Sequence, residues 1–537
     1  MTTDAPILQR QLDPPPGRPE PKGSAPVRRT PPLLMAAGVG VALLALVPLG
    51  FVVAYTVIIG PAEAWDLLVR PRIAELLWNT VRLVVSGMAA SLVIGVGCAW
   101  VVERTDLPWR PLWHGLLVAP LAVPAFVNSF GWVSLTHAVE GYAGAVMIVT
   151  LSYYPLVYLP VVASLRGLDP ALEETAYSLE HGRWRTFWRV VLPQLRPAML
   201  GGSLLVGLHL LAEFGALQML RFPTFTTAIY DQYRSTFNGP AANMIAGVLV
   251  LCCALLLTAE LRLRGHRHYA RVAHGAARPV ERQRLGVARW PVLAVLTGVL
   301  ALAVGLPTYS LLHWLSVGSS TEFPVGELLA AAGTSLGLGA AGAAMTVVLA
   351  LPVAWLAIRY RSLASTAVER STYVANALPG IVVALALVTV SIRVVAPAYQ
   401  TFGLLLVAYA IMFLPRAVVS VRAALEQAPV VLDDVAHSLG AGPIATARRV
   451  TLPVIAPGIG AGAALVFLAV STELTATLML APIDTSTLAT EFWSASSSVA
   501  YGAAAPYALL LVLISVPATI LLGRHATLAA PSGRMFG

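Results

Sequence analysis

Two stretches of the chain decide its fold: EETAYSLEHGRWRTFWRVVLPQLRPA at residues 173–198 and DDVAHSLGAGPIATARRVTLPVIAPG at residues 433–458. They align without a gap at a constant offset of 260 residues. Each reads as a polar helix, a turn, a basic helix and a Leu-Pro pair. The chain therefore contains an internal repeat. The identical positions include Ala176 with Ala436, Ser178 with Ser438, Leu179 with Leu439, Gly182 with Gly442, Arg189 with Arg449, Leu192-Pro193 with Leu452-Pro453, and Pro197 with Pro457.

The sequence around these stretches is apolar. Hydrophobic residues make up 57% of the 537 residues and charged residues only 11%, whereas soluble domains carry about 25% charged residues. We therefore expect an all-α polytopic membrane protein. Runs of about 20 apolar residues, the length that crosses a bilayer, predict twelve transmembrane helices. They lie near 33–60, 79–102, 112–136, 142–165, 199–220, 240–261, 290–316, 331–358, 372–395, 401–424, 458–482 and 504–523.

Prolines interrupt two of these runs. Pro120 and Pro124 lie in the third run and Pro379 lies in the ninth. Because proline removes a helical hydrogen bond, we expect kinked or broken helices there.

An arginine-rich linker, residues 262–289, divides the chain into two halves of six runs, residues 33–261 and 290–523. The earlier parts of the halves align at offset 255, through Trp100 with Trp355 and Pro124 with Pro379. An even number of spans per half predicts direct repeats around an axis along the membrane normal. Residues 1–32 and 524–537 are expected to be cytosolic tails, the first of them disordered.

The basic residues predict the orientation. With the N-terminus inside, 29 of the 35 Lys and Arg residues lie in cytosolic segments, which places both termini in the cytosol. The net charge of +9 therefore reflects topology and predicts no nucleic-acid partner. Loop 1 (residues 166–198) and loop 2 (residues 425–457), which carry the repeated stretches, are expected on the cytosolic face. A pair of docking surfaces for a two-fold partner explains the repetition; surface helices that only orient the bundle are the alternative.

The loops resemble the EAA loop of permease subunits of binding-protein-dependent ABC importers. That pattern is an acid, a small residue, Ala, three residues, Gly, nine residues, an aliphatic residue, one residue, and Leu-Pro. Loop 2 fits it through Asp434, Ala436 and Gly440. Loop 1 fits through Glu174 and Ala176 but has Glu180 at the glycine position, so Gly182 is expected to form that turn.

The resemblance implies a MetI-like permease fold in a bacterial cytoplasmic (inner) membrane. It further implies two copies of a cytosolic ABC ATPase and an extracytoplasmic substrate-binding protein as partners. The coupling residues would be the acids Glu173, Glu174, Asp433 and Asp434, which face donors on the ATPases, with Ala176 and Ala436 for close approach and Gly182 and Gly440 for the turns.

The fused layout resembles the ferric-iron permeases in particular. Residues 212–233, 471–493 and 501–513 carry this likeness. Import of thiamine or 2-aminoethylphosphonate remains an alternative within the same class.

Two acids, Glu213 and Glu473, lie in apolar runs, each 40 residues after the first acid of its loop. Intramembrane carboxylates are costly and usually face a cavity or a partner. One interpretation is a symmetric pair that lines a path for a cation such as ferric iron. The other is a structural carboxylate, hydrogen-bonded to a neighbouring helix. His209, one turn away, could be its partner, but a buried histidine that makes one hydrogen bond of its own is the simpler explanation of His209.

Several motifs carry little information. The single lysine, Lys22, excludes a Walker-type ATP site, so we expect no ATPase activity, no cofactor and no metal site in this chain. Gly337-x-Gly339-x-x-Gly342 lies inside an apolar run and indicates helix packing. His266 and His268 lack further ligands at metal-binding spacing. A secondary transporter driven by an ion gradient would favour inverted repeats, which the sequence does not have.

Overall fold

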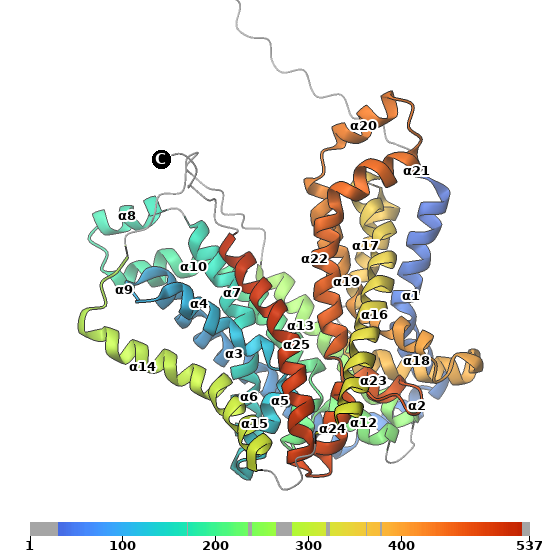
Figure 1. Ribbon diagram of the computed structural model, residues 1–537, viewed down its shortest axis with the longest axis horizontal. Coiled ribbons are helices and arrows are strands. Elements are labelled where there is room, and N and C mark those ends of the chain that lie inside the picture. Colours follow the sequence, from blue (N-terminus) through green and yellow to red (C-terminus); the bar gives the residue numbers. More distant parts are fainter. Residues whose placement is uncertain are drawn as a thin grey trace, which may run out of the picture.

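The computed structural model describes residues 30–168, 170–234, 239–264, 282–317, 323–360, 362–375 and 378–528. This part of the chain is almost entirely helical and contains no β-strand, apart from one isolated bridge between Thr105 and Gln283. Residues 1–29 of the predicted N-terminal tail and the two linker histidines, His266 and His268, lie outside the described residues. The all-α prediction is confirmed (Figure 1).

Three helices form the centre of each half. In the first half α3 (Pro71–Arg104), α7 (Pro155–Gly167) and α10 (Leu192–Ala212) pack on one another. The second half repeats this arrangement with α16 (Val325–Arg359), α19 (Phe402–Gln427) and α22 (Leu452–Ser471). Small residues permit the close approach, because a Cβ added at Gly95 would lie 2.8 Å from the Cβ of Val157.

The glycines of the GLGAAG stretch behave as predicted. Gly339 and Gly342 lie on α16 and pack against side chains of α22, whereas Gly337 faces open space. Two of the three glycines, Gly339 and Gly342, therefore serve helix packing.

The first span of each half packs on the other half. Helix α1 (Pro32–Ile59) contacts α16, α17 (Leu363–Ala375) and α18 (Gly380–Val394), and Arg393 donates a hydrogen bond of 3.2 Å to the Tyr55 hydroxyl. Helix α15 (Leu306–Val317), which continues α14 (Arg289–Leu300) through η5 (Ala301–Gly305), contacts α5 (Ala125–Val133) and α25 (Tyr501–Leu528). The exchange interlocks the halves (Figure 1).

The spans agree closely with the predicted runs. Eight helices are long and apolar enough to cross a membrane, and three bent helix pairs bring the total to eleven among the described residues. The twelfth predicted run coincides with α25, whose apolar part covers Tyr501–Pro517. The predicted breaks are confirmed, since the pair Arg110–Ala122 and Ala125–Val133 bends by 87° and a second bend separates α17 from α18.

Two predicted runs end earlier than expected. The fifth and eleventh were expected at 199–220 and 458–482, but α10 covers Leu192–Ala212 and α22 covers Leu452–Ser471. Glu213 and Glu473 therefore lie just beyond helix ends rather than inside continuous spans. With 21 residues in α10 and a rise of about 1.5 Å per residue, Glu213 lies about 30 Å along the helix axis from Leu192, the first residue of α10.

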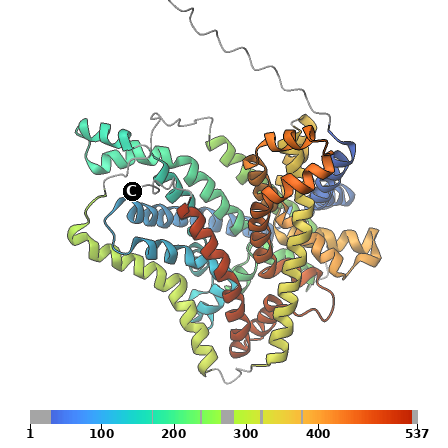
Figure 2. The same cartoon turned by 45° about the horizontal axis from the view of Figure 1, so that its top comes forward.

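Loop 1 and loop 2 lie at the same end of the helix bundle. Figure 1 shows α8 (Pro170–Ser178) and α20 (Val430–Ser438) at the top, and α12 (Phe225–Arg234) and α24 (Leu488–Ser497) at the bottom. Figure 2 shows the loops on opposite sides of this top surface. We call the top surface the loop face and the bottom surface the opposite face.

The remaining helices are short connections or complete the spans. They are α2 (Pro61–Leu68), α4 (Arg110–Val118), η1 (Ala119–Ala122), η2 (His137–Val139), α6 (Tyr142–Tyr153), α9 (Arg183–Thr186), η3 (Phe187–Val191), α11 (Gly215–Met219), α13 (Gly239–Arg264), η4 (Gly286–Ala288), η6 (Ala396–Ala398), α21 (Pro443–Thr446), η7 (Ala447–Thr451) and α23 (Thr475–Leu480).

Candidate functional site

The two loops have the same backbone plan. Each contains a nine-residue helix (α8 or α20), a turn, a four-residue helix (α9 or α21) and a wider turn of helix (η3 or η7) that runs into a core helix. Every one of these elements begins 260 residues apart in the two halves. The polar helix, turn and basic helix read from the sequence are thus present in both loops.

The turns of the two loops differ in residue but not in conformation. Glu180 has φ +58° and Gly440 has φ +84°, both in the left-handed region. In loop 1 the amides of Glu180 and His181 donate to the carbonyls of Tyr177 and Ala176, each at 3.0 Å. The amides of Gly440 and Ala441 bond in the same way in loop 2. These are the two hydrogen bonds of a Schellman helix end.

The expectation for Gly182 was therefore wrong. Glu180 itself adopts the left-handed conformation, so the turn is not moved to Gly182. The Gly182 carbonyl instead accepts the amide of Thr186 at 3.0 Å at the start of α9, as Gly442 accepts Thr446 at 2.9 Å in loop 2.

The first acid of each loop is buried in an ion pair. Glu173 and Asp433 are each only 6% exposed. Glu173 lies 2.8 Å from the Arg104 guanidinium, and Asp433 lies 3.2 Å from that of Arg359. The two arginines are the last residues of α3 and α16. Each pair therefore joins a loop helix to the end of a core helix.

This corrects part of the expectation for the four loop acids. Only Glu174 and Asp434 are exposed, while Glu173 and Asp433 point into their own chain. Ala176 and Ala436 are buried as well, at 4% and 8% exposed, so they pack within the chain instead of on its surface. Helical periodicity explains the division, because residues three apart share a face of α8 or α20 and adjacent residues do not.

The outer surface of each loop carries apolar side chains. Leu179 and Trp184 are exposed in loop 1, and their counterparts Leu439 and Ile444 are exposed in loop 2. Exposed apolar side chains that form a contiguous patch mark protein-interaction sites.

Sequence reasoning missed the two arginines. Arg104 and Arg359 correspond at the offset of 255 that aligns the earlier parts of the halves, and this match was the available signal. Arg104 also donates to the Leu165 carbonyl at 3.3 Å, and Arg359 to the Ala428 carbonyl at 3.5 Å. Each arginine thus contacts the end of a second core helix, α7 or α19.

Burial raises the pKa of the Glu173 carboxyl, and the Arg104 guanidinium acts in the opposite direction.

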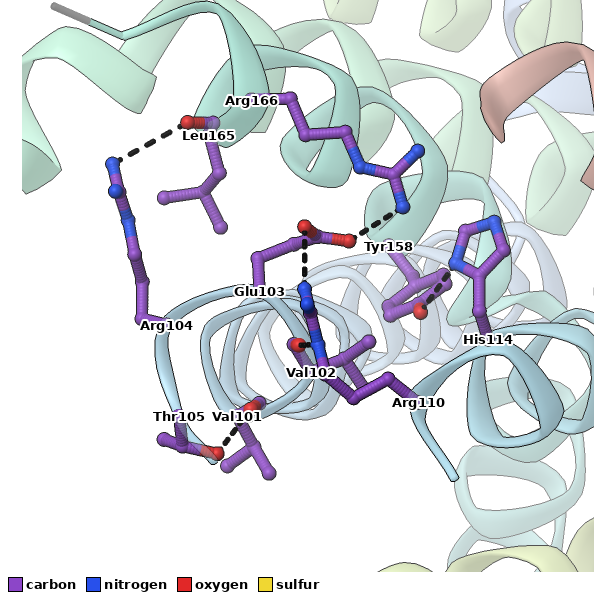
Figure 3. Close-up of polar contacts among 10 residues, drawn as sticks. All are labelled: Val101, Val102, Glu103, Arg104, Thr105, Arg110, His114, Tyr158, Leu165 and Arg166. Carbon is purple, nitrogen blue, oxygen red and sulfur yellow. Dashed lines mark hydrogen bonds and ion pairs between the residues drawn. The ribbon is translucent and has the colours of Figure 1, made fainter. Parts of the chain in front are cut away.

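A second polar network surrounds the end of α3. Figure 3 shows the Glu103 carboxylate between Arg110, at 3.1 Å, and Arg166, at 2.6 Å. The end of the linker binds the end of α3 next to this network, since the Gln283 backbone amide donates to the Arg104 carbonyl at 2.9 Å. These contacts fix the end of α3, and with it Arg104, on the loop face.

The intramembrane acids Glu213 and Glu473 lie at helix breaks. Glu213 accepts the Tyr153 hydroxyl at 2.5 Å and the Ala216 amide at 2.9 Å. Glu473 accepts the Ala476 amide at 2.9 Å. Each carboxylate thus receives an N–H group at the start of a short helix, α11 or α23, where anions are favoured. Both side chains are only partly buried.

His209 is not the partner of Glu213. Its Nδ1 forms a hydrogen bond of 2.8 Å with the Leu205 carbonyl in the same helix. The simpler explanation of this histidine, one hydrogen bond of its own, is confirmed.

A cavity of about 600 Å³ lies between the halves at the opposite face. The first half contributes residues from α5, η2, α11 and α12, and the second half contributes residues from α23, α24 and α25. Its charged lining includes Glu140, Asp231, Arg221 and Arg234. Within the described residues, no three His, Cys, Asp or Glu side chains gather closely enough to hold a metal ion.

Comparisons with known proteins agree with the repeat. The family described as "Binding-protein-dependent transport system inner membrane component" matches residues 91–262 and again residues 346–528. The chain is 39% identical over 502 residues to Fe(3+)-transport system permease protein FbpB 2 of Haemophilus influenzae, covering 93% of this chain and 99% of the relative. It is 22% identical over 497 residues to Ferric transport system permease protein FbpB of Actinobacillus pleuropneumoniae, covering 84% and 71%.

Some relatives match less than half of the chain. Molybdenum transport system permease protein ModB of Escherichia coli is 31% identical over 223 residues, which cover 37% of this chain and 96% of the relative.

Proposed function

The chain belongs to the family of binding-protein-dependent transport system inner membrane components, and it is a multi-pass membrane transport subunit. We propose that it is the fused permease of an ATP-driven ferric-iron importer. The observation that supports ferric iron as the substrate is the alignment with the Haemophilus influenzae Fe(3+) permease. This alignment covers both halves and nearly the whole length of both proteins. The half-length relatives named for molybdenum or sulfate align with only 40% of the chain or less.

The loops supply the contact with the energy source. Two copies of a cytosolic ABC ATPase would bind, one on each loop, through Glu174 and Asp434 and the exposed apolar side chains beside them. ATP is then hydrolysed by the partner, and this chain binds no cofactor. This assignment places the loop face and both termini in the cytosol, in agreement with the 29 of 35 basic residues expected on that side.

The opposite face would receive a loaded substrate-binding protein. Its cavity lies between the halves, where relative movement of the halves changes its shape. Glu213 and Glu473 are partly exposed carboxylates at corresponding positions of the two halves. Because intramembrane carboxylates are costly and usually face a cavity or a partner, we place both on the translocation path of a cation.

The substrate is tested by reconstituting the chain in proteoliposomes with its ATPase and its binding protein. Ferric iron on the binding protein is expected to stimulate ATP hydrolysis and to accumulate inside the vesicles. Sulfate, molybdate, thiamine and 2-aminoethylphosphonate serve as competing substrates, and stimulation by one of them without ferric iron would contradict the assignment. Uptake that follows an ion gradient without ATP would instead favour a secondary transporter.

A further inference from the structure

Each buried ion pair lies between a loop helix and the ends of two core helices. Residues 173 and 433 directly precede the exposed acids Glu174 and Asp434, so a partner that binds the exposed acid pulls on the helix that carries the buried one. The buried acid is bonded to the last residue of α3 or α16, and the same arginine reaches the end of α7 or α19. One guanidinium therefore connects three elements in each half.

The chain itself attaches each loop helix only through its two ends. Helix α8 is a nine-residue segment between the end of α7 and the left-handed turn at Glu180. Helices this short are marginal without tertiary contacts. The inward face of α8 is small, with Ala176 and Glu173 as its buried residues. The ion pair between Glu173 and Arg104 is thus a buried charged contact that fixes α8 to the membrane-embedded helices.

The two pairs have a similar geometry although their residues and spacing differ. The acids are Glu in one half and Asp in the other, and the arginines lie at an offset of 255 whereas the acids lie at 260. Both pairs are nevertheless nearly inaccessible, with side chains of 4–9% exposure. Because burying a pair of charges gives little net stability over apolar residues, an additional role explains their presence in both halves.

We propose that Arg104 and Arg359 are positioning residues of transport coupling: each holds its loop helix rigidly on α3 or α16, so that displacement of the loop by the ATPase moves these core helices. The inference rests on the proposed function. Without the arginine, the loop helix still binds the ATPase but turns about its two chain connections. ATP is then hydrolysed without the matching movement of the membrane helices.

The test compares uptake with hydrolysis in the same vesicles. The double variant Arg104→Gln with Arg359→Gln is expected to bind the ATPase and hydrolyse ATP, while the number of ions taken up per ATP falls at least ten-fold. The charge-exchanged chain, with Arg104→Glu, Glu173→Arg, Arg359→Asp and Asp433→Arg, is expected to recover part of the ratio. The matched control Arg422→Gln removes an arginine that pairs with Glu369 and Glu426 instead of a buried loop acid, and its ratio is expected to stay unchanged.

An unchanged ratio in the double variant overturns the inference, because an arginine needed only for folding would reduce the amount of complex and not the uptake per ATP. If the glutamine variants do not insert, Glu173→Gln with Asp433→Asn keeps the side-chain volumes, and an unchanged ratio there overturns it equally. Failure of the unaltered chain to take up ferric iron while ATPase binding persists would instead count against the proposed substrate.

Discussion

Loop 1 completes its turn with Glu180, whereas loop 2 uses Gly440, and both backbones adopt the left-handed conformation at that position. Loop 1 has Val191 where loop 2 has Thr451, whose hydroxyl donates to Asp433 at 2.7 Å. The buried acid, its arginine and the Leu-Pro pair are common to both loops. The helix anchored by the ion pair is therefore the constant feature of the two loops, whereas the turn residue and the additional hydrogen bond from Thr451 differ between them.

The intramembrane acids show the same kind of difference. Tyr153 donates to Glu213 in the first half. At the offset of 260 that also relates Pro155 to Pro415, the corresponding residue in the second half is Phe413, which has no hydroxyl. The second half instead places Arg416 within electrostatic range of Glu473. Direct repeats have therefore kept the position of the carboxylate and changed what surrounds it.

The largest effect is expected where the loops are alike. Glu174→Arg together with Asp434→Arg reverses the charge of both exposed acids, so we expect loss of ATPase binding and of transport with normal membrane insertion. Uptake, co-purification of the ATPase and the amount of chain in the membrane measure this. The same charge change at Glu63 and Asp66 on α2, at the opposite face, is the control for ATPase binding. Undiminished uptake by the loop variant would sink the loop assignment.

A smaller effect is expected where only loop 2 has an accessory bond. Thr451→Val removes a hydrogen bond to a buried carboxylate, a bond worth about 2 kcal/mol, and should lower the free energy of unfolding by about that amount. Val191→Thr in loop 1 is the matched variant and should not lower it as much. The free energy of unfolding in mixed micelles measures both. Equal losses for the two variants would show that the hydroxyl bond in loop 2 contributes nothing specific.

The smallest effect concerns the turn. A residue with a Cβ costs about 1–2 kcal/mol in the left-handed region, so Glu180→Gly should raise the free energy of unfolding by about 1 kcal/mol. Gly440→Glu should lower it by a similar amount. Measurements in the same micelles decide this, and a destabilising Glu180→Gly would mean that the glutamate side chain makes a contact that outweighs its backbone strain.

Much of the architecture could be predicted from the sequence because it depends on local signals. The length of the apolar runs set the spans, and Pro120, Pro124 and Pro379 marked two of the breaks. The breaks at Glu213 and Glu473 were missed because the apolar letters continue through them. Their cause is a carboxylate that accepts the amides of the next short helix, a contact that hydropathy does not report.

The anchors were missed for a different reason. Arg104 and Glu173 are 69 residues apart, and Arg359 and Asp433 are 74 apart. The repeat relates the two arginines to each other, but their sequence spacing from the acids does not indicate that they form ion pairs. The exchange of α1 and α15 between the halves is likewise a property of packing, since a span reads the same whichever half it contacts.

If both loops of the chain bind an ATPase subunit, the mass of the purified complex reveals it most directly. Native mass measurement of the chain with its ATPase bound should give two ATPase copies for each chain. A complex that contains a single ATPase copy for each chain would contradict the account.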